Sequence, residues 1–75
     1  MENYKNLSGT SGVAAFEQGA DFIKVQFSDG SVYQYTYTSA GEGSIAQMKA
    51  LAVRGLGLNS FINTTVKHRY SAKLR

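Results

Sequence analysis

The most restrictive feature of this sequence is a pair of alternating segments joined by a short polar turn, "DFIKVQFSDGSVYQYTYT" at residues 21–38. Alternate side chains of a strand share one face, so each segment has an apolar face and a polar face. The Asp-Gly pair between the segments is a strong signal for a hairpin. The sequence therefore predicts two antiparallel strands and a row of tyrosines that either faces a partner or lies in the core. The apolar side chains are Ile23, Val25 and Phe27 in the first segment and Tyr33, Tyr35 and Tyr37 in the second.

The length of the connecting loop decides which face of the hairpin carries the tyrosines. A two-residue loop, Asp29-Gly30, opposes Val25 to Gln34 and leaves the tyrosines outside with the polar side chains. A three-residue loop, with Gly30 left-handed in a bulge, opposes Val25 to Tyr33 and collects the apolar residues on one face. Since burial of a large aromatic side chain contributes on the order of 2–3 kcal/mol, the second arrangement is favoured. We therefore expect the tyrosines to face the core and not to form an open stacking platform.

The remaining segments predict a three-stranded antiparallel meander followed by two helices. "VAAFE" at 13–17 is a short apolar run before a glycine and is typical of a first strand. After the loop at 39–43, the apolar spacing becomes that of a helix that starts at Ser44, with Gln47 completing a capping box. Its apolar side is formed by Ile45, Met48, Leu51 and Ala52, and Gly55 is expected to end it.

A second helix is expected after the glycine-rich turn at 55–59, with an Asn-Ser pair available as its cap. Ile62, Val66 and Tyr70 recur at a spacing of four residues, which places them in one narrow apolar stripe. The predicted fold class is therefore α+β, with the two C-terminal helices packed on the sheet face that carries the tyrosines.

Length and composition restrict the class of protein further. The chain of 75 residues corresponds to one domain at 13–75, preceded by a polar and flexible segment at 1–12. It contains no cysteine, which excludes disulfides and thiolate metal sites. No apolar run is long enough to span a bilayer, and the N-terminus lacks the apolar centre of a signal peptide. We therefore expect a soluble, cytoplasmic protein without a cofactor or a metal.

Little in the sequence supports catalytic or metal-binding chemistry. His68 is the only histidine, whereas a zinc site needs three or four ligands. Asp21 and Asp29 fall at predicted turns, where turn geometry explains them. The stretch "GLGLN" at 55–59 leads into a helix but lacks the lysine of a phosphate-binding loop, so a tight turn explains its glycines. We therefore expect a protein that is not an enzyme.

The strongest indication of function is the distribution of charge. The net charge is +3, yet residues 1–42 contain all 5 acids and residues 43–75 contain none. Such asymmetry between two halves is typical of binding to an anionic partner. It is equally typical of cations that stabilise helix ends and keep a protein in solution, so both interpretations stay open. The candidate contacts to nucleic acid are Lys49, Arg54, Lys67, Arg69, Lys73 and Arg75.

Two stretches, "IKVQFSDGSVYQY" and "GLGLNSFINTTVKHRY", resemble the KTSC domain, which occurs at the C-terminus of some lysyl-tRNA synthetases and as small free-standing bacterial proteins. The resemblance covers about residues 11–70 and departs in two loops, where "TSAGEG" lacks a proline and "RGLGLNS" is longer. It suggests RNA binding only by association with a tRNA-charging enzyme. The matching residues are Phe27, Gly30, Tyr33, Tyr35, Gly57, Phe61, Ile62, Asn63, Val66 and Tyr70, and Ile23 and Val25 complete the expected core.

Two functional hypotheses of different classes follow. The first is a small accessory module that binds RNA or another nucleic acid through its basic C-terminal half. The second is a protein–protein or self-association module that uses an edge strand or the open sheet face. The two differ in their response to salt, which weakens phosphate contacts steeply and strand pairing little. The open face would carry Lys24, Gln26, Val32, Gln34 and Thr36.

Overall fold

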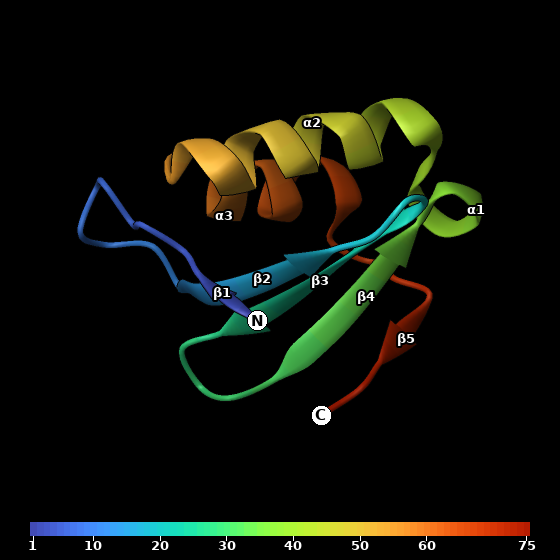
Figure 1. The fold of residues 1–75 in the computed structure, drawn as a ribbon. Helices are drawn as coiled ribbons and strands as arrows, with labels where there is room; N and C mark the ends of the chain where they lie inside the picture. The colour runs from blue at the N-terminus through green and yellow to red at the C-terminus, as the bar shows by residue number, and fades with distance from the viewer.

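The predicted hairpin lies at the centre of a five-stranded antiparallel sheet (Figure 1). The structure, a computed structural model, describes residues 1–75. Neighbours in the sheet are also consecutive strands of the chain, so the N-terminal strand forms one edge and the C-terminal strand the other. The strands are β1 (Glu2–Asn3), β2 (Val13–Gln18), β3 (Phe22–Phe27), β4 (Val32–Thr36) and β5 (Ala72–Lys73).

The fold class is confirmed as α+β with an antiparallel sheet, but the expected number of three strands is wrong. The two additional strands, β1 and β5, are each 2 residues long and lie near the ends of the chain. Two residues are too few to show an alternating pattern, so local sequence carries no signal for them. Their pairing with β2 and β4 depends on tertiary contacts.

The register of the β3–β4 hairpin is the one that the three-residue loop requires. Val25 pairs with Tyr33, and Ile23 pairs with Tyr35. Gly30 has a φ of 91°, in the left-handed region that favours glycine. The bulged turn and the placement of Tyr33 and Tyr35 on the apolar face are therefore confirmed.

Hydrogen bonds inside the turn stabilise this loop. The Asp29 carboxylate accepts the Ser31 hydroxyl at 2.6 Å and the Ser31 backbone N–H at 2.9 Å. These bonds, the one from the Ser31 side chain above all, hold the pKa of the Asp29 carboxyl below its ordinary value. A further bond anchors the turn to the rest of the molecule, because the Ser28 N–H donates to the Gly12 carbonyl at 2.7 Å.

The row of tyrosines ends earlier than predicted, because β4 stops at Thr36. Tyr37 begins a short helix, α1 (Tyr37–Ala40), and is 38% exposed, so its expected place on the core face is wrong. The Thr36 hydroxyl accepts the Ser39 N–H at 3.1 Å, and the Ser39 hydroxyl accepts the Thr36 N–H at 3.0 Å. This capping box stabilises a turn at a place where alternation alone favours a strand.

The first predicted helix is present as α2 (Glu42–Arg54). It starts before Ser44, and no side chain caps it, so the capping box expected at Ser44 is not formed. Its end is as predicted, because Gly55 is left-handed with a φ of 80° and donates its N–H to the Leu51 carbonyl at 2.9 Å. Of the four side chains predicted for its apolar side, Ile45, Met48 and Ala52 are buried, and Leu51 is partly buried against the core.

The second helical segment is shorter than predicted and has two parts. α3 (Leu58–Phe61) follows a left-handed glycine and continues into a π-helical turn, η1 (Ile62–Val66). Both ends of this turn are buried, Ile62 at 3% exposed and Val66 at 0%. The helix ends there, so the expected helical position of Tyr70 is wrong, and the chain instead returns to the sheet as β5.

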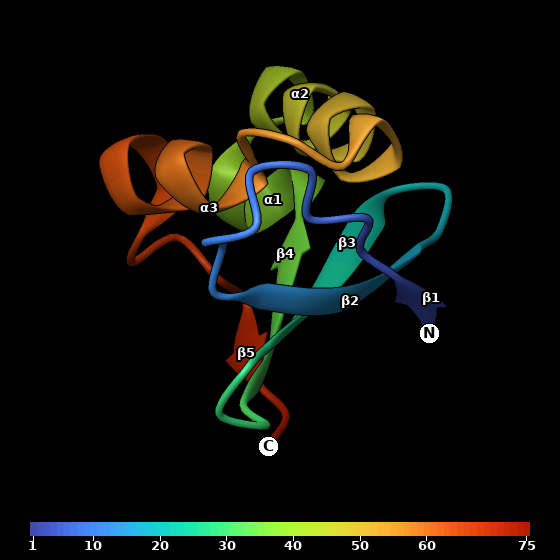
Figure 2. The same ribbon diagram turned by 90° about the vertical axis from the view of Figure 1, so that its left-hand side faces the viewer.

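The hydrophobic core lies between one face of the sheet and the helices, which Figures 1 and 2 show on the same side of it. Phe16 from β2 and Tyr35 from β4 are each 1% exposed, and Ile45 from α2 is 0% exposed. The segment 1–12 also contributes to this core through Tyr4, whose hydroxyl accepts the Leu58 N–H at 3.3 Å.

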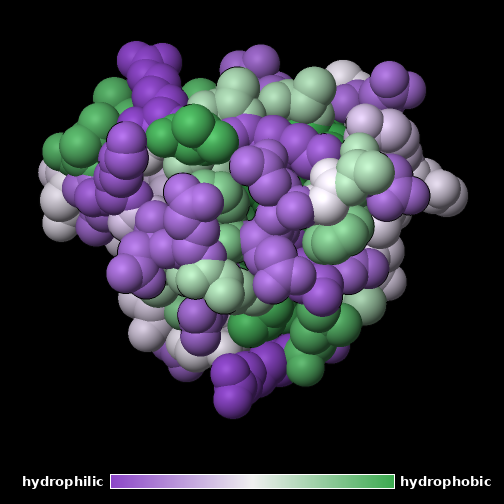
Figure 3. Space-filling view, viewed as in Figure 1, coloured by the Kyte–Doolittle hydropathy of each residue, from purple (hydrophilic) through white to green (hydrophobic).

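The surface of the molecule is mainly polar. On the face drawn in Figure 3, hydrophilic side chains dominate and hydrophobic ones lie in small separate groups. None of the helices has the length and hydrophobicity needed to cross a membrane.

Candidate nucleic-acid interface

A cavity of about 280 Å³ opens between the β3–β4 hairpin and the segment that comprises η1 and the residues up to Tyr70. Five of the residues that line it are largely apolar: Phe27, Tyr33, Tyr35, Ile62 and Tyr70. Three polar residues complete it: Asn63, Lys67 and His68. We call this cavity the tyrosine cup. It combines residues from the two stretches that resemble the KTSC pattern, which are far apart in the sequence.

The aromatic rings of the tyrosine cup pack edge to face. The ring centroids of Tyr33 and Tyr70 are 4.8 Å apart with an interplanar angle of 68°. Phe27 and Tyr33 follow at 5.8 Å and 80°, and Tyr35 and Tyr70 at 6.4 Å and 89°. Such T-shaped pairs are favourable beyond their burial, so Tyr70 is held against β4 although it lies outside any helix.

Tyr33 and Tyr35 differ in how much water reaches them. Tyr35 is 1% exposed, and its burial, with smaller contributions from the neighbouring Tyr33 and Tyr70, raises the pKa of its hydroxyl to about 12. No buried side-chain nitrogen or oxygen lacks a hydrogen-bond partner, so the Tyr35 hydroxyl, which forms no hydrogen bond, ends at the cup surface. Tyr33 is half-buried and forms the open side of the same row.

Four of the six predicted cationic contacts lie on the segment from 67 to 75. Lys67 lines the cup, and Lys73, which pairs with Tyr33 across β4 and β5, places its Nζ 5.7 Å from the Tyr33 ring centroid. Arg69 is exposed between them, and Arg75 lies beside Lys73 in a shallow hollow at the β3–β4 turn. None of these four side chains forms a salt bridge, although Asp29 lines the same hollow as Lys73 and Arg75.

The other two predicted contacts lie elsewhere. The Lys49 Nζ donates to the Gly19 carbonyl at 2.5 Å and to the Ala20 carbonyl at 3.2 Å, so this side chain ties α2 to the β2–β3 turn. Arg54 is exposed at the C-terminal end of α2, which lies away from β5 in Figures 1 and 2. The structure thus places Lys67 in the lining of the cup and Lys73 over the Tyr33 ring, and leaves Lys49 and Arg54 apart from the cup.

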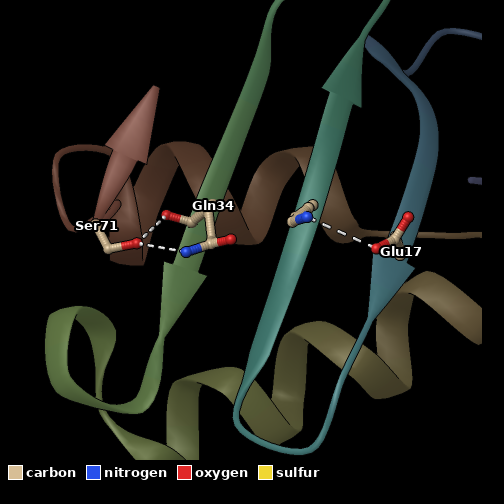
Figure 4. Close-up of polar contacts among 4 residues, drawn as sticks. Glu17, Gln34 and Ser71 are labelled. Atoms are coloured by element: carbon tan, nitrogen blue, oxygen red, sulfur yellow. Dashed lines mark hydrogen bonds and ion pairs between the residues drawn. The ribbon is translucent and has the colours of Figure 1, made fainter. Parts of the chain in front are cut away.

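The opposite face of the sheet has a different character. Lys24 pairs with Glu17 at 3.7 Å, the one salt bridge in the molecule, and the Gln34 amide donates to the Ser71 hydroxyl at 3.3 Å (Figure 4). Val32 is 6% exposed on this face, outside the hydrophobic core. The charged groups here are already paired, and no helix covers them in Figure 1.

A second hollow, of about 220 Å³, lies between the segment 8–11 and the turn before α3. Its lining is almost entirely hydroxyl and amide groups, from Ser8, Thr10, Ser11, Asn59 and Ser60. It contains no cation and no aromatic ring, which sets it apart from the tyrosine cup. No group of His, Asp and Glu side chains is arranged to hold a metal ion.

The sequence analysis singled out most residues of the tyrosine cup, but it did not predict that they line one cavity. Tyr33 and Tyr35 were expected in the core, and Tyr70 on a helix. The role of β5 in placing Lys73 next to Tyr33 was missed, and so were Asn63 and His68 as lining residues of one cavity. The signal that points to them is the stretch "VKHRY", in which cations and an aromatic side chain follow the last apolar residue of the helix.

Comparison of the chain with protein-family models, with curated proteins and with solved structures found no match in any of the three. The resemblance to the KTSC domain therefore stays a prediction that rests on the residues quoted for it.

Proposed function

We propose that this protein is a small, non-enzymatic module of the KTSC type that binds RNA through the phosphates, using the segment from 67 to 75. The observation that carries the proposal is that Lys67 lines the aromatic cavity while the Nζ of Lys73 lies 5.7 Å from the ring centroid of Tyr33, which lines the same cavity. Neither lysine has an acidic partner in a salt bridge. Cations beside aromatic rings are the combination by which single-stranded nucleic acids are bound without a sequence code.

The number of cations sets the strength of binding that we expect. Lys67, Arg69, Lys73 and Arg75 allow about three or four phosphate contacts, which for a single strand gives a slope of about −2 to −3 in a plot of log affinity against log salt. Affinity should then fall about 20- to 50-fold between about 50 and 200 mM salt. A protein–protein contact through the sheet would change far less.

The test compares two triple variants that remove the same charge. The first changes Lys67, Arg69 and Lys73 to Gln, and all three are exposed, so the fold should remain intact. The control variant is Lys5→Gln, Lys24→Gln and Arg54→Gln, on other surfaces. Titration of a short single-stranded RNA at low salt, read by backbone amide shifts, should lose most binding in the first variant and little in the control.

The proposal makes a local prediction for the same titration. Amide shifts should appear in 66–75 and along β4. Equal loss of binding in both triple variants would mean that only net charge matters. Shifts confined to the opposite sheet face, at Lys24 and Gln26, would contradict the proposal and favour a partner on that face.

The alternative, self-association or a protein partner, has a narrower basis. The two edge strands, β1 and β5, are each 2 residues long. Very short edge strands are a means by which native sheets avoid pairing with another chain. The open sheet face therefore remains the surface for this alternative, and a measurement of molecular mass in solution at high and low salt tests it.

A further inference from the structure

We infer that the tyrosine cup binds one unpaired base of a single strand, so that the protein distinguishes single-stranded from double-stranded RNA. This inference rests on the proposed binding of RNA phosphates by the segment from 67 to 75. It adds to that proposal an occupant for the cavity between β4 and the end of η1. The argument has three parts: the size of the cavity, its lining and its charged rim.

The size of the cup suits a single ring system. Its volume of about 280 Å³ is just below the range of about 300–1,000 Å³ that is usual for sites of drug-sized ligands. A cavity of this volume accommodates one planar ring system of a polynucleotide and not several nucleotides in a row. The rest of a longer ligand must therefore run along the rim.

The lining of the cup suits a base in particular. Phe27, Tyr33 and Tyr70 offer aromatic surface, and every base has a π-face with which to stack on such rings. Tyr70 is 38% exposed, so its ring remains accessible to a ligand. The Asn63 side chain is also exposed and forms no hydrogen bond within the protein, so its amide can donate to and accept from the edge of a base.

The cations at the rim favour a base that belongs to a strand with phosphates. Lys67 lines the cup, and the Lys73 Nζ lies 5.7 Å from the ring centroid of Tyr33, another lining residue. A base that enters the cup therefore brings the phosphates of its own nucleotide near these cations. A duplex keeps its bases stacked inside and presents only its backbone to the rim, so it gains nothing from the cup.

The experiment uses the unchanged protein and three probes of about eight nucleotides: a single-stranded RNA, a strand of the same length whose nucleotides lack bases, and an RNA duplex. All three carry phosphates, but only the first offers unpaired bases. At about 50 mM salt, we expect the single strand to bind about tenfold more tightly than the base-free strand. The duplex should bind no more tightly per phosphate than the base-free strand.

Two matched variants locate the base. Tyr70 and Tyr37 are each 38% exposed, but only Tyr70 lines the cup. Tyr70→Ala should reduce the affinity for single-stranded RNA to that for the base-free strand, whereas Tyr37→Ala should leave the difference intact. Asn63→Ala, at an exposed position, provides a second variant that does not disturb the core.

The outcomes separate this inference from the proposed function. If the base-free strand binds the unchanged protein as tightly as the intact strand, the cup takes no base, although phosphate binding stands. If none of the three probes binds at low salt, the proposed function is wrong and the inference is wrong with it. Because these comparisons need no variant, a loss of folding in Tyr70→Ala does not affect them.

Discussion

Tyr33 and Tyr35 are neighbours on one face of β4, but the two halves of this face differ. At the Tyr35 end, the sheet lies in the core together with Ile45 and Met48 of α2, and Tyr35 is 1% exposed. At the Tyr33 end, the face is half-buried and is completed by Phe27, by Tyr70 and by the Lys73 side chain. One strand with one alternating pattern therefore supplies both a core and a cavity.

The difference shows that the extent of helical cover, and not the sequence of β4, determines which part of this face belongs to the core and which part lines the cup. α3 and η1 end at Val66, which is 0% exposed and belongs to the core. Beyond it the helical cover stops, and an irregular segment with cations replaces it. The helical segment ends at Val66 and not, as the sequence predicts, at Tyr70, so residues 67–71 lead the chain back to the sheet before β5 begins at Ala72.

The largest effect that we expect comes from truncating the two tyrosines in turn. Tyr35→Ala should lower the free energy of unfolding by about 3–5 kcal/mol, because a fully buried aromatic side chain leaves a cavity behind. Tyr33→Ala should cost about 1–2 kcal/mol, since its ring is only half-buried. Urea unfolding followed by circular dichroism measures both values.

This pair of variants can break the comparison between the two halves. Equal losses of stability would mean that the cup is as much a part of the core as the Tyr35 end. In that case Tyr33 would have no special availability for a ligand. A smaller loss at Tyr33, together with reduced RNA affinity, would sharpen the distinction.

A smaller effect concerns the turn that places Tyr33 on this face. Gly30 and Gly43 both have open space where a Cβ atom would be, but only Gly30 has a positive φ, of 91°. Gly30→Ala should therefore cost about 1–2 kcal/mol through backbone conformation alone. Gly43→Ala, in the first turn of α2, should stabilise the protein by up to about 1 kcal/mol. Thermal unfolding of both variants measures whether each change lowers or raises the stability. An unchanged stability in Gly30→Ala would contradict the left-handed turn.

The smallest effect is expected from Tyr35→Phe at neutral pH. The Tyr35 hydroxyl forms no hydrogen bond in the protein, so its removal should change the free energy of unfolding by less than about 0.5 kcal/mol. At alkaline pH the two proteins should diverge. The pKa of Tyr35 is raised from 10.0 to about 12 in the folded state, so the folded protein holds this proton more tightly than the unfolded chain.

The sign of the pH effect follows from that difference. The contribution of Tyr35 to stability is complete below pH 10.0 and is lost as the pH rises through about 12. As the pH rises between these two values, the free energy of unfolding should fall more in the unchanged protein than in Tyr35→Phe. An equal decline in both proteins would show that Tyr35 titrates like an exposed tyrosine, and the two halves of the β4 face would then be alike.

Much of the central fold could be predicted from local sequence. The register Val25–Tyr33 followed from the spacing of apolar residues and the length of a Ser-Asp-Gly loop. The end of α2 at Gly55 followed from the preference of glycine for the left-handed region. In each case the energy that determines the local structure, from burial or from backbone strain, depends on residues that are close in the chain.

The parts that sequence reasoning missed depend on distant residues. β5 joins the sheet because Ser71 and Gln34, 37 residues apart, exchange hydrogen bonds, and no local pattern encodes this. Similarly, α1 replaces the end of the predicted strand through the Thr36–Ser39 capping box. The six candidate cationic residues were predicted as one basic half, but only the fold shows that Lys49 ties α2 to a turn, that Lys67 lines the tyrosine cup and that Lys73 lies over the Tyr33 ring.

The distance in sequence between the two walls of the cup has a kinetic consequence. The β3–β4 hairpin forms from neighbouring residues, whereas the pairing of β4 with β5 must close a loop that spans the whole helical segment, and such non-local contacts form late in folding. The C-terminal wall should also be the first part to open in local fluctuations of the native state, because β5 contributes only 2 residues to the sheet. A ligand in the cup would hold this last-formed wall in place and, by mass action, would protect the amides of β4 and β5 from hydrogen exchange.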